Sequence, residues 1–131
     1  MLKNILLVGL GSSIGGMLRY VISLVIKNNS FPYATLTVNI IGSFCIGLIF
    51  AFSIKEYSLS DEIRLFFATG ICGGFTTFSA FSLENIQLIK STNYSIAFLY
   101  ITLSILLRIA AVFAGYTIMV YLIERSSMGK S

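Results

Sequence analysis

Four long apolar stretches, separated by short polar connections, decide what this chain can fold into. They lie at about 4–26, 32–54, 62–89 and 95–123, and each can cross about 30 Å of hydrocarbon at about 1.5 Å per helical residue. Inside lipid, backbone groups find hydrogen-bond partners only within helices or closed barrels. The sequence therefore predicts an all-α membrane protein with four transmembrane helices, forming a single domain over 1–131.

The composition agrees with a membrane protein. Of the 131 residues, 56% are hydrophobic and only 11% are charged, and the mean hydropathy is +0.92. Because the connections are short, any activity must lie within the membrane or at its two surfaces. Lys3 precedes the first apolar run, but the run is too long for a signal peptide and contains Arg19 and Tyr20, so we expect it to be retained.

Several functional classes lack the residues they need. Cys45 and Cys72 are the only cysteines and there is no histidine, so neither a zinc site nor a histidine-assisted nucleophile can be assembled. We therefore expect no enzyme. The net charge of +4 comes from basic residues scattered at the ends of apolar stretches, which is not the clustered pattern of a nucleic-acid-binding protein.

The distribution of basic residues only weakly specifies an orientation in the membrane. The termini and the middle connection carry five basic residues and the other two connections carry two, namely Lys3, Lys55, Arg64, Arg125 and Lys130 against Lys27 and Lys90. Nearby acidic residues offset the excess. The positive-inside rule thus favours cytoplasmic termini modestly, and insertion in both orientations stays open.

Many polar side chains fall inside the predicted spans, where each needs a partner helix or a water-filled cavity. They are Thr35, Asn39, Thr76, Thr77, Ser79, Ser82, Glu84, Ser104 and Arg108. Four helices form a thin bundle, so we expect at least a dimer. Gly11 and Gly15 form a small-xxx-small pattern, which indicates close helix contact and is by itself generic.

Residues 70–84 hold the most informative pattern. Gly73 and Gly74 are followed by Thr76 and Thr77 in the middle of the third stretch. Gly costs about 1 kcal/mol against Ala in a helix and β-branched Thr restricts χ1, so we predict a break near 73–77. A break frees backbone carbonyls, which must be buried in protein, hydrated or bound to a cation. A simple kink is the alternative, and composition alone favours it.

Two phenylalanines follow the predicted break. Phe78 and Phe81 share a helical face, and Ser79 with Ser82 forms the neighbouring polar stripe. Core packing is the usual role of such rings. Beside hydroxyls in a broken helix, however, a ring edge with partial positive charge can face an anion without the grip of a full cation.

The second and fourth stretches each carry a polar stripe. Asn39 lies at mid-span on one face with Thr35, and it must be hydrogen-bonded in an interior, with interhelical bonding as the simpler role. One continuous face of the fourth stretch holds Tyr100, Ser104, Arg108, Ala111 and Gly115. Hydroxyl and amide donors are the groups that can replace water around a small, strongly hydrated anion.

Three motifs occur along the chain. Residues 15–20 read GGMLRY, 35–44 read TLTVNIIGSF and 73–82 read GGFTTFSAFS. They resemble the GAxxRY, TLxVNxxGSF and GGxTTFSTF motifs of the Fluc/CrcB family of fluoride channels. Length, span number and motif order agree with that family along nearly the whole chain.

The resemblance implies an antiparallel dual-topology dimer in the cell inner (plasma) membrane, with two narrow fluoride pores. Such a dimer exports cytoplasmic fluoride passively and protects the cell from its toxicity. The implied partners are fluoride, the lipid bilayer, and a second copy or a homologous chain. The resemblance also implies a structural Na⁺ at the dimer centre, held by the backbone carbonyls of Gly73 and Thr76.

The same resemblance implies which residues line the fluoride path. They are Asn39, Phe78, Phe81, Thr35, Thr77, Ser79, Ser82, Tyr100 and Ser104. Glu84 and Arg19 match positions near the pore end and the aqueous vestibule.

The chain departs from the family pattern at two positions. Ala80 stands where Thr is usual, and Arg108 stands where a small or hydroxylated residue is expected. A buried guanidinium is costly unless it is paired, and Glu84 is the candidate partner. Arg108 could also attract anions or mark a specialised subunit.

Two other functions compete with the channel. A small multidrug-type exporter needs a mid-span carboxylate in its first helix, and residues 4–26 contain no Asp or Glu. A non-transporting membrane assembly subunit would explain the packing motifs but not the faces lined by hydrogen-bond donors.

Overall fold

The structure is a computed structural model that describes residues 1–27, 30–55 and 59–128, and the secondary structure in these ranges is helical. Three spans are single helices, with α1 at Leu2–Val25, α2 at Tyr33–Lys55 and α6 at Tyr94–Met128. The third is built from α3 (Asp61–Arg64), the π-helix η1 (Leu65–Cys72), α4 (Gly73–Phe75) and α5 (Ser79–Lys90). Within the described residues, four helical segments are long and apolar enough to cross a membrane, which confirms the predicted all-α membrane fold.

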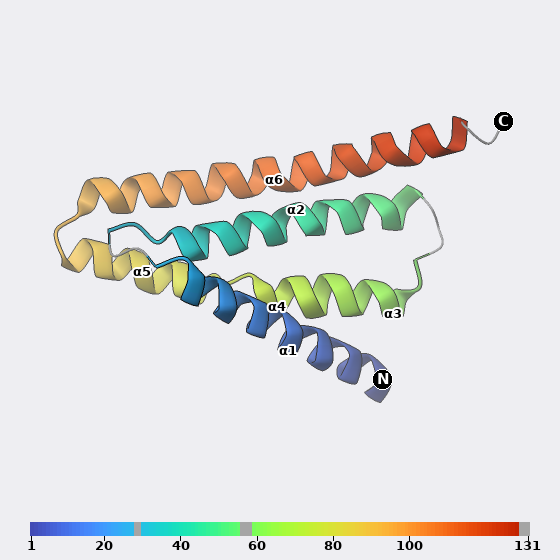
Figure 1. The fold of residues 1–131 in the computed structure, drawn as a ribbon, viewed down its shortest axis with the longest axis horizontal. Coiled ribbons are helices and arrows are strands. Elements are labelled where there is room, and N and C mark those ends of the chain that lie inside the picture. Colours follow the sequence, from blue (N-terminus) through green and yellow to red (C-terminus); the bar gives the residue numbers. More distant parts are fainter. Residues whose placement is uncertain (28–29, 56–58, 129–131) are drawn as a thin grey trace.

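The spans form two closely packed pairs. In Figure 1, α2 and α6 run side by side in the same direction and α2 lies between α6 and the third span. The blue helix α1 crosses the third span at an angle and contacts mainly η1 and α4. This arrangement puts the middle of the third span between α1 and α2.

Small residues bring α2 and α6 into backbone contact. A Cβ added at Gly47 would collide with the Val112 carbonyl oxygen, and one added at Gly115 would collide with the Phe44 carbonyl oxygen. Ala51, one turn beyond Gly47, is fully buried. Such close approach is typical of membrane helices, which lack a hydrophobic driving force and associate through tight packing.

Glycines also bring α1 against the third span. A Cβ at Gly15 would meet the backbone of Ile71 and Phe75, and one at Gly74 would meet the backbone of Ser12. Gly11 approaches Gly70 in the same way. The small-xxx-small pattern of α1 therefore serves contact within one chain.

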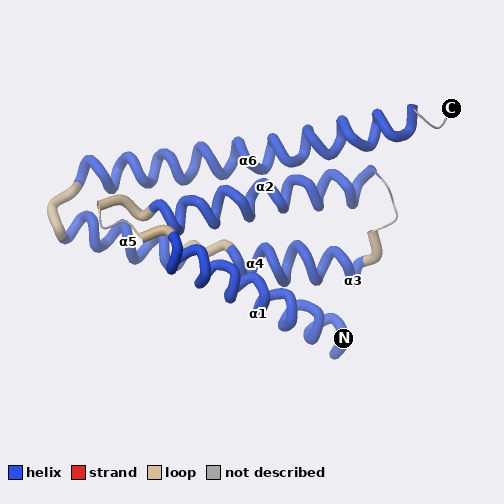
Figure 2. Tube along the Cα trace, viewed as in Figure 1, coloured by secondary structure: helices blue, strands red, loops and turns tan. Residues whose placement is uncertain are grey.

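The break in the third span lies slightly beyond the glycines that predicted it. Thr76 is extended, with φ −78° and ψ 157°, and the tan segment between α4 and α5 in Figure 2 marks the interruption. Gly73 and Gly74 remain helical. Gly74 is needed for the contact with α1, whereas the chain leaves the helix at the two threonines, whose hydroxyls take over local hydrogen bonds.

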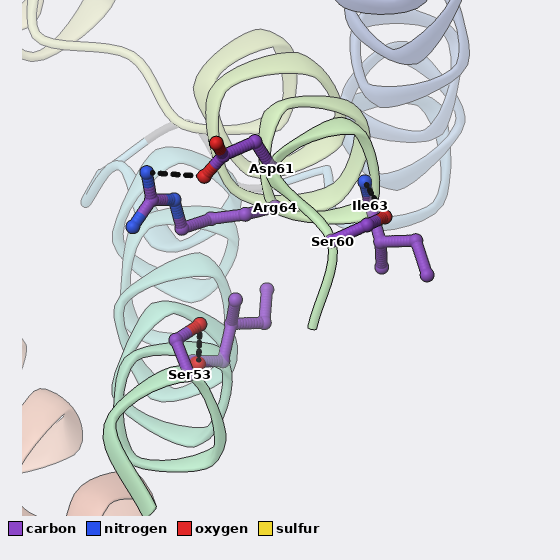
Figure 3. A network of polar contacts seen from close by, with 6 residues as sticks. Ser53, Ser60, Asp61, Ile63 and Arg64 are labelled. Atoms are coloured by element: carbon purple, nitrogen blue, oxygen red, sulfur yellow. Dashed lines mark hydrogen bonds and ion pairs between the residues drawn. The ribbon is translucent and has the colours of Figure 1, made fainter. Parts of the chain in front are cut away.

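Polar contacts fix the end of the bundle where the third span begins. The Ser60 hydroxyl caps α3 by accepting from the Ile63 amide at 3.3 Å, and Arg64 pairs with Asp61 at 3.1 Å (Figure 3). Lys3 of α1 pairs with Glu62 at 2.6 Å. At the same end α6 continues to Met128, beyond the predicted limit at 123, because its last turns are polar and do not need lipid.

Candidate functional site

Asn39 holds the broken segment. Its Oδ1 accepts from the Thr77 amide at 2.8 Å, and its Nδ2 donates to the Thr77 carbonyl at 3.0 Å. Asn39 is only 1% exposed, so both groups are bonded in the interior. One side chain of α2 thus replaces the two helical hydrogen bonds that Thr77 loses at the break.

Two carbonyls at the break lose their usual donors. In an unbroken helix the amide of Thr77 would donate to the Gly73 carbonyl, and the amide of Ala80 to the Thr76 carbonyl. Here the Thr77 amide donates to Asn39, and the Ala80 amide donates to the Thr77 hydroxyl at 3.1 Å. Both of the carbonyls implied as Na⁺ ligands are therefore released from helical pairing. Oxygen ligands of this kind suit hard cations.

The two phenylalanines after the break lie together in different environments. Their ring centroids are 5.6 Å apart. Phe81 is 9% exposed and packs on Tyr100 at 5.1 Å, whereas Phe78 is 71% exposed at the surface of the single chain. A ring so exposed faces either lipid or a second chain.

Glu84 joins three helices. Its Oε1 accepts from the Thr35 hydroxyl of α2 at 2.6 Å, and its Oε2 accepts from the Tyr100 hydroxyl of α6 at 2.7 Å. It also lines a cavity of about 610 Å³ with Phe31, Pro32 and Gln87 among its walls. The open cavity gives the Glu84 side chain room to move. If it moves, the two hydroxyls that now donate to it become free to donate to another acceptor.

Around Glu84, the predicted face of α6 is mostly interior. Tyr100 is fully buried, Ser104 is 2% exposed, and Ala111 and Gly115 are buried. Arg108 on the same face is half-buried. Among the described residues the Ser104 hydroxyl makes no hydrogen bond, so it is available to donate one to a ligand.

The predicted site residues form two polar clusters. Asn39, Thr77 and Ser79 make one, with the Thr77 and Ser79 hydroxyls 3.2 Å apart, and Thr35, Glu84 and Tyr100 make the other. The Ser82 hydroxyl donates to the Phe78 carbonyl at 3.0 Å. Arg19 on α1 is half-buried and, among the described residues, makes no hydrogen bond or ion pair with either cluster.

One expectation about polar residues needs correction, and another stays a prediction. The single chain buries Thr35, Asn39, Thr77 and Ser104. The other five polar residues stay exposed or half-buried, so the expected dimer remains a prediction; they are Thr76, Ser79, Ser82, Glu84 and Arg108. Within the described chain Glu84 forms no ion pair with Arg108, and its two oxygens instead accept from the hydroxyls of Thr35 and Tyr100. The packing of α2 and α6 around Glu84 satisfies more polar groups than a thin bundle was expected to satisfy.

Sequence reasoning missed one buried amide. Asn85 is 7% exposed and its Nδ2 donates to the Phe81 carbonyl at 2.8 Å, but its buried Oδ1 has no partner among the described groups. The only signal was its position one turn after Phe81 on the same helical face. Such an acceptor is suited to an ordered water.

The sequence comparisons decide the family. The family model described as CrcB-like protein, Camphor Resistance (CrcB), matches residues 6–116. The chain belongs to the CrcB family. Together with the four apolar spans, this makes the CrcB chain a multi-pass membrane protein.

Curated relatives of this CrcB chain share nearly their whole length with it. A protein of Azobacteroides pseudotrichonymphae is 48% identical over 119 residues, covering 88% of this chain and 95% of the relative. One of Flavobacterium psychrophilum is 47% identical over 120 residues, covering 89% and 97%, and one of Agrobacterium fabrum is 44% identical over 115 residues, covering 86% and 92%. All three are named fluoride-specific ion channel FluC, which describes channels and not enzymes.

Proposed function

We propose that this chain is the subunit of a fluoride-selective channel that lets cytoplasmic fluoride leave the cell passively and lowers its toxicity. The names of the relatives support fluoride as the ion. The observation that carries the proposal is the mid-membrane break, surrounded by uncharged donors and phenyl rings from α2, α5 and α6. Such groups compensate lost hydration of a small anion without trapping it.

The fluoride path follows the two polar clusters and the rings between them. Phe78 and Phe81 offer ring edges, and Asn39, Thr77, Ser79 and Ser82 supply amide and hydroxyl donors near the break. The Thr35 and Tyr100 hydroxyls can donate to fluoride only when their hydrogen bonds to the Glu84 carboxylate break. The Ser104 hydroxyl makes no such bond and can donate directly. Arg19 acts at the aqueous vestibule.

The working unit is an antiparallel dimer with a structural Na⁺ at its centre. Two features support this. The Gly73 and Thr76 carbonyls have lost their helical donors, and Gly73 and Phe78 lie on the exposed side of the single chain. A second copy, or a homologous chain, covers this side and adds its own two carbonyls. Four neutral oxygens then surround one cation.

The test is fluoride efflux from liposomes that hold the purified protein and potassium fluoride. Adding a potassium ionophore should discharge fluoride rapidly, while chloride-loaded vesicles discharge far more slowly. Ser104→Ala, which removes an uncommitted donor, should slow fluoride efflux severalfold. Ser23→Ala is the matched control, because its exposed hydroxyl only donates to the Tyr20 carbonyl of its own helix at 2.6 Å. Efflux no faster than from empty vesicles, with folded protein present, contradicts the proposal.

A further inference from the structure

Arg108 places a permanent positive charge deep in the membrane. It lies in α6 about 21 Å from the first residue of that helix, at about 1.5 Å per residue. An arginine near a helix end can extend its charged group to the membrane surface, but one at this depth cannot. Its guanidinium therefore needs a partner inside the protein.

The face of α6 that carries Arg108 turns toward α2. Ser104 is 2% exposed and Ala111 is 9% exposed, and Gly115 packs against the backbone of Phe44 and Leu48. Helical side chains lean toward the N-terminal end of their helix. The guanidinium of Arg108 thus leans toward Ser104, which lies one turn earlier on the same face.

No acidic side chain in the described part of the chain forms an ion pair with Arg108. The acids there are Asp61, Glu62, Glu84 and Glu124, and of these only Glu84 lies away from the span ends. Both Glu84 oxygens already accept hydroxyl hydrogen bonds. Among the described residues Arg108 makes neither an ion pair nor a hydrogen bond.

We propose that Arg108 and the Ser104 hydroxyl form an anion-binding station that holds one small monovalent anion in the middle of the span. The station combines the N–H donors and positive charge of the guanidinium with one uncommitted hydroxyl, so its ligand must be a negatively charged hydrogen-bond acceptor. The proposal rests on the proposed function, which makes that anion fluoride. A second fluoride arriving along the polar track then displaces the first, as ions do in multi-site pores.

The experiment measures fluoride binding and fluoride transport separately. Binding to purified protein in detergent is followed by equilibrium dialysis with a fluoride electrode, and transport by efflux from liposomes over a range of fluoride concentrations. Arg108→Gln removes the charge and Arg108→Lys keeps it. Arg125→Gln is the matched control, because Arg125 is an exposed arginine in the last turn of the same helix. Size-exclusion chromatography checks the assembly of each variant.

Arg108→Gln should weaken fluoride binding about tenfold or more and raise the half-saturating fluoride concentration for efflux to match, because a charge at contact distance is lost. Arg108→Lys should stay within about threefold of wild type, since it retains the charge as a point donor. Arg125→Gln should match wild type in both measurements.

Unchanged fluoride binding in Arg108→Gln, or no binding to wild type at millimolar fluoride, overturns the station. So does dissociation of Arg108→Gln assemblies whose subunits still bind fluoride, because the guanidinium would then serve a subunit contact. The proposed function fails by a different result, which is wild-type vesicles that pass no fluoride although the protein binds it at Arg108.

Discussion

Asn39 is the residue on which the broken span depends most. A buried backbone group without a partner costs about 1–3 kcal/mol, and the Asn39 amide satisfies two such groups of Thr77. The same amide decides which carbonyls are released, since it takes the Thr77 amide away from Gly73. A side chain of one span thereby sets the backbone of another.

Phe78 and Phe81 should separate conduction from stability. Replacing either by Ile should slow fluoride efflux about fivefold, because a ring contact of about 1 kcal/mol corresponds to roughly that factor in rate. Only Phe81→Ile should also destabilise the chain, by about 1 kcal/mol, since Phe81 packs on Tyr100 and Phe78 is 71% exposed. Efflux and thermal unfolding measured on both variants check this, and wild-type efflux in both would remove the rings from the path.

At this scale the sequence predicts residue types better than contacts. The need of Asn39 for an interior partner followed from its polarity at mid-span, but its partner Thr77 lies on another helix and could not be read from spacing. Glu84 was paired with the wrong side chain for the same reason. Two hydroxyls from α2 and α6 reach it, and their approach depends on how those helices pack.

The third span combines a π-helix, a short α-helix and an extended turn. Local sequence predicted the break, because adjacent glycines and threonines are poor helix formers. It did not predict the π-helix at Leu65–Cys72, which packs against α1. Local sequence also did not show that Gly74 allows close packing. A side chain at this position would collide with α1, and that collision is evident only when the position of α1 is known.

Two adjacent glycines of α1 should respond in opposite ways to the same change. Gly15→Ala places a methyl group against the backbone of Ile71 and Phe75 and should destabilise the fold by about 1–3 kcal/mol. Gly16 has nothing within 4 Å of an added Cβ, so Gly16→Ala should be neutral or stabilise by up to about 1 kcal/mol. Thermal unfolding in detergent compares them. Equal unfolding temperatures would show that α1 does not pack through Gly15.

The whole molecule presents two kinds of surface. Large apolar side chains of α1 and α6 are exposed along both helices, as expected for surfaces that face acyl chains. The exposed side at Gly73 and Phe78 differs, because a released carbonyl facing lipid would be costly. This difference supports the proposal that a second copy and its Na⁺ lie on that side. The number of spans followed directly from sequence length and hydropathy, whereas this distinction required the break in three dimensions.

The most direct measurement is the reversal potential of the purified protein in a planar bilayer. With a tenfold fluoride gradient and equal chloride on both sides, a fluoride-selective pore should reverse at about 59 mV, the full potential for a tenfold ratio of a monovalent ion. A reversal potential near zero, as a chloride current gives, or one of opposite sign, as a current of the counter-cation gives, would contradict fluoride selectivity along the broken third span.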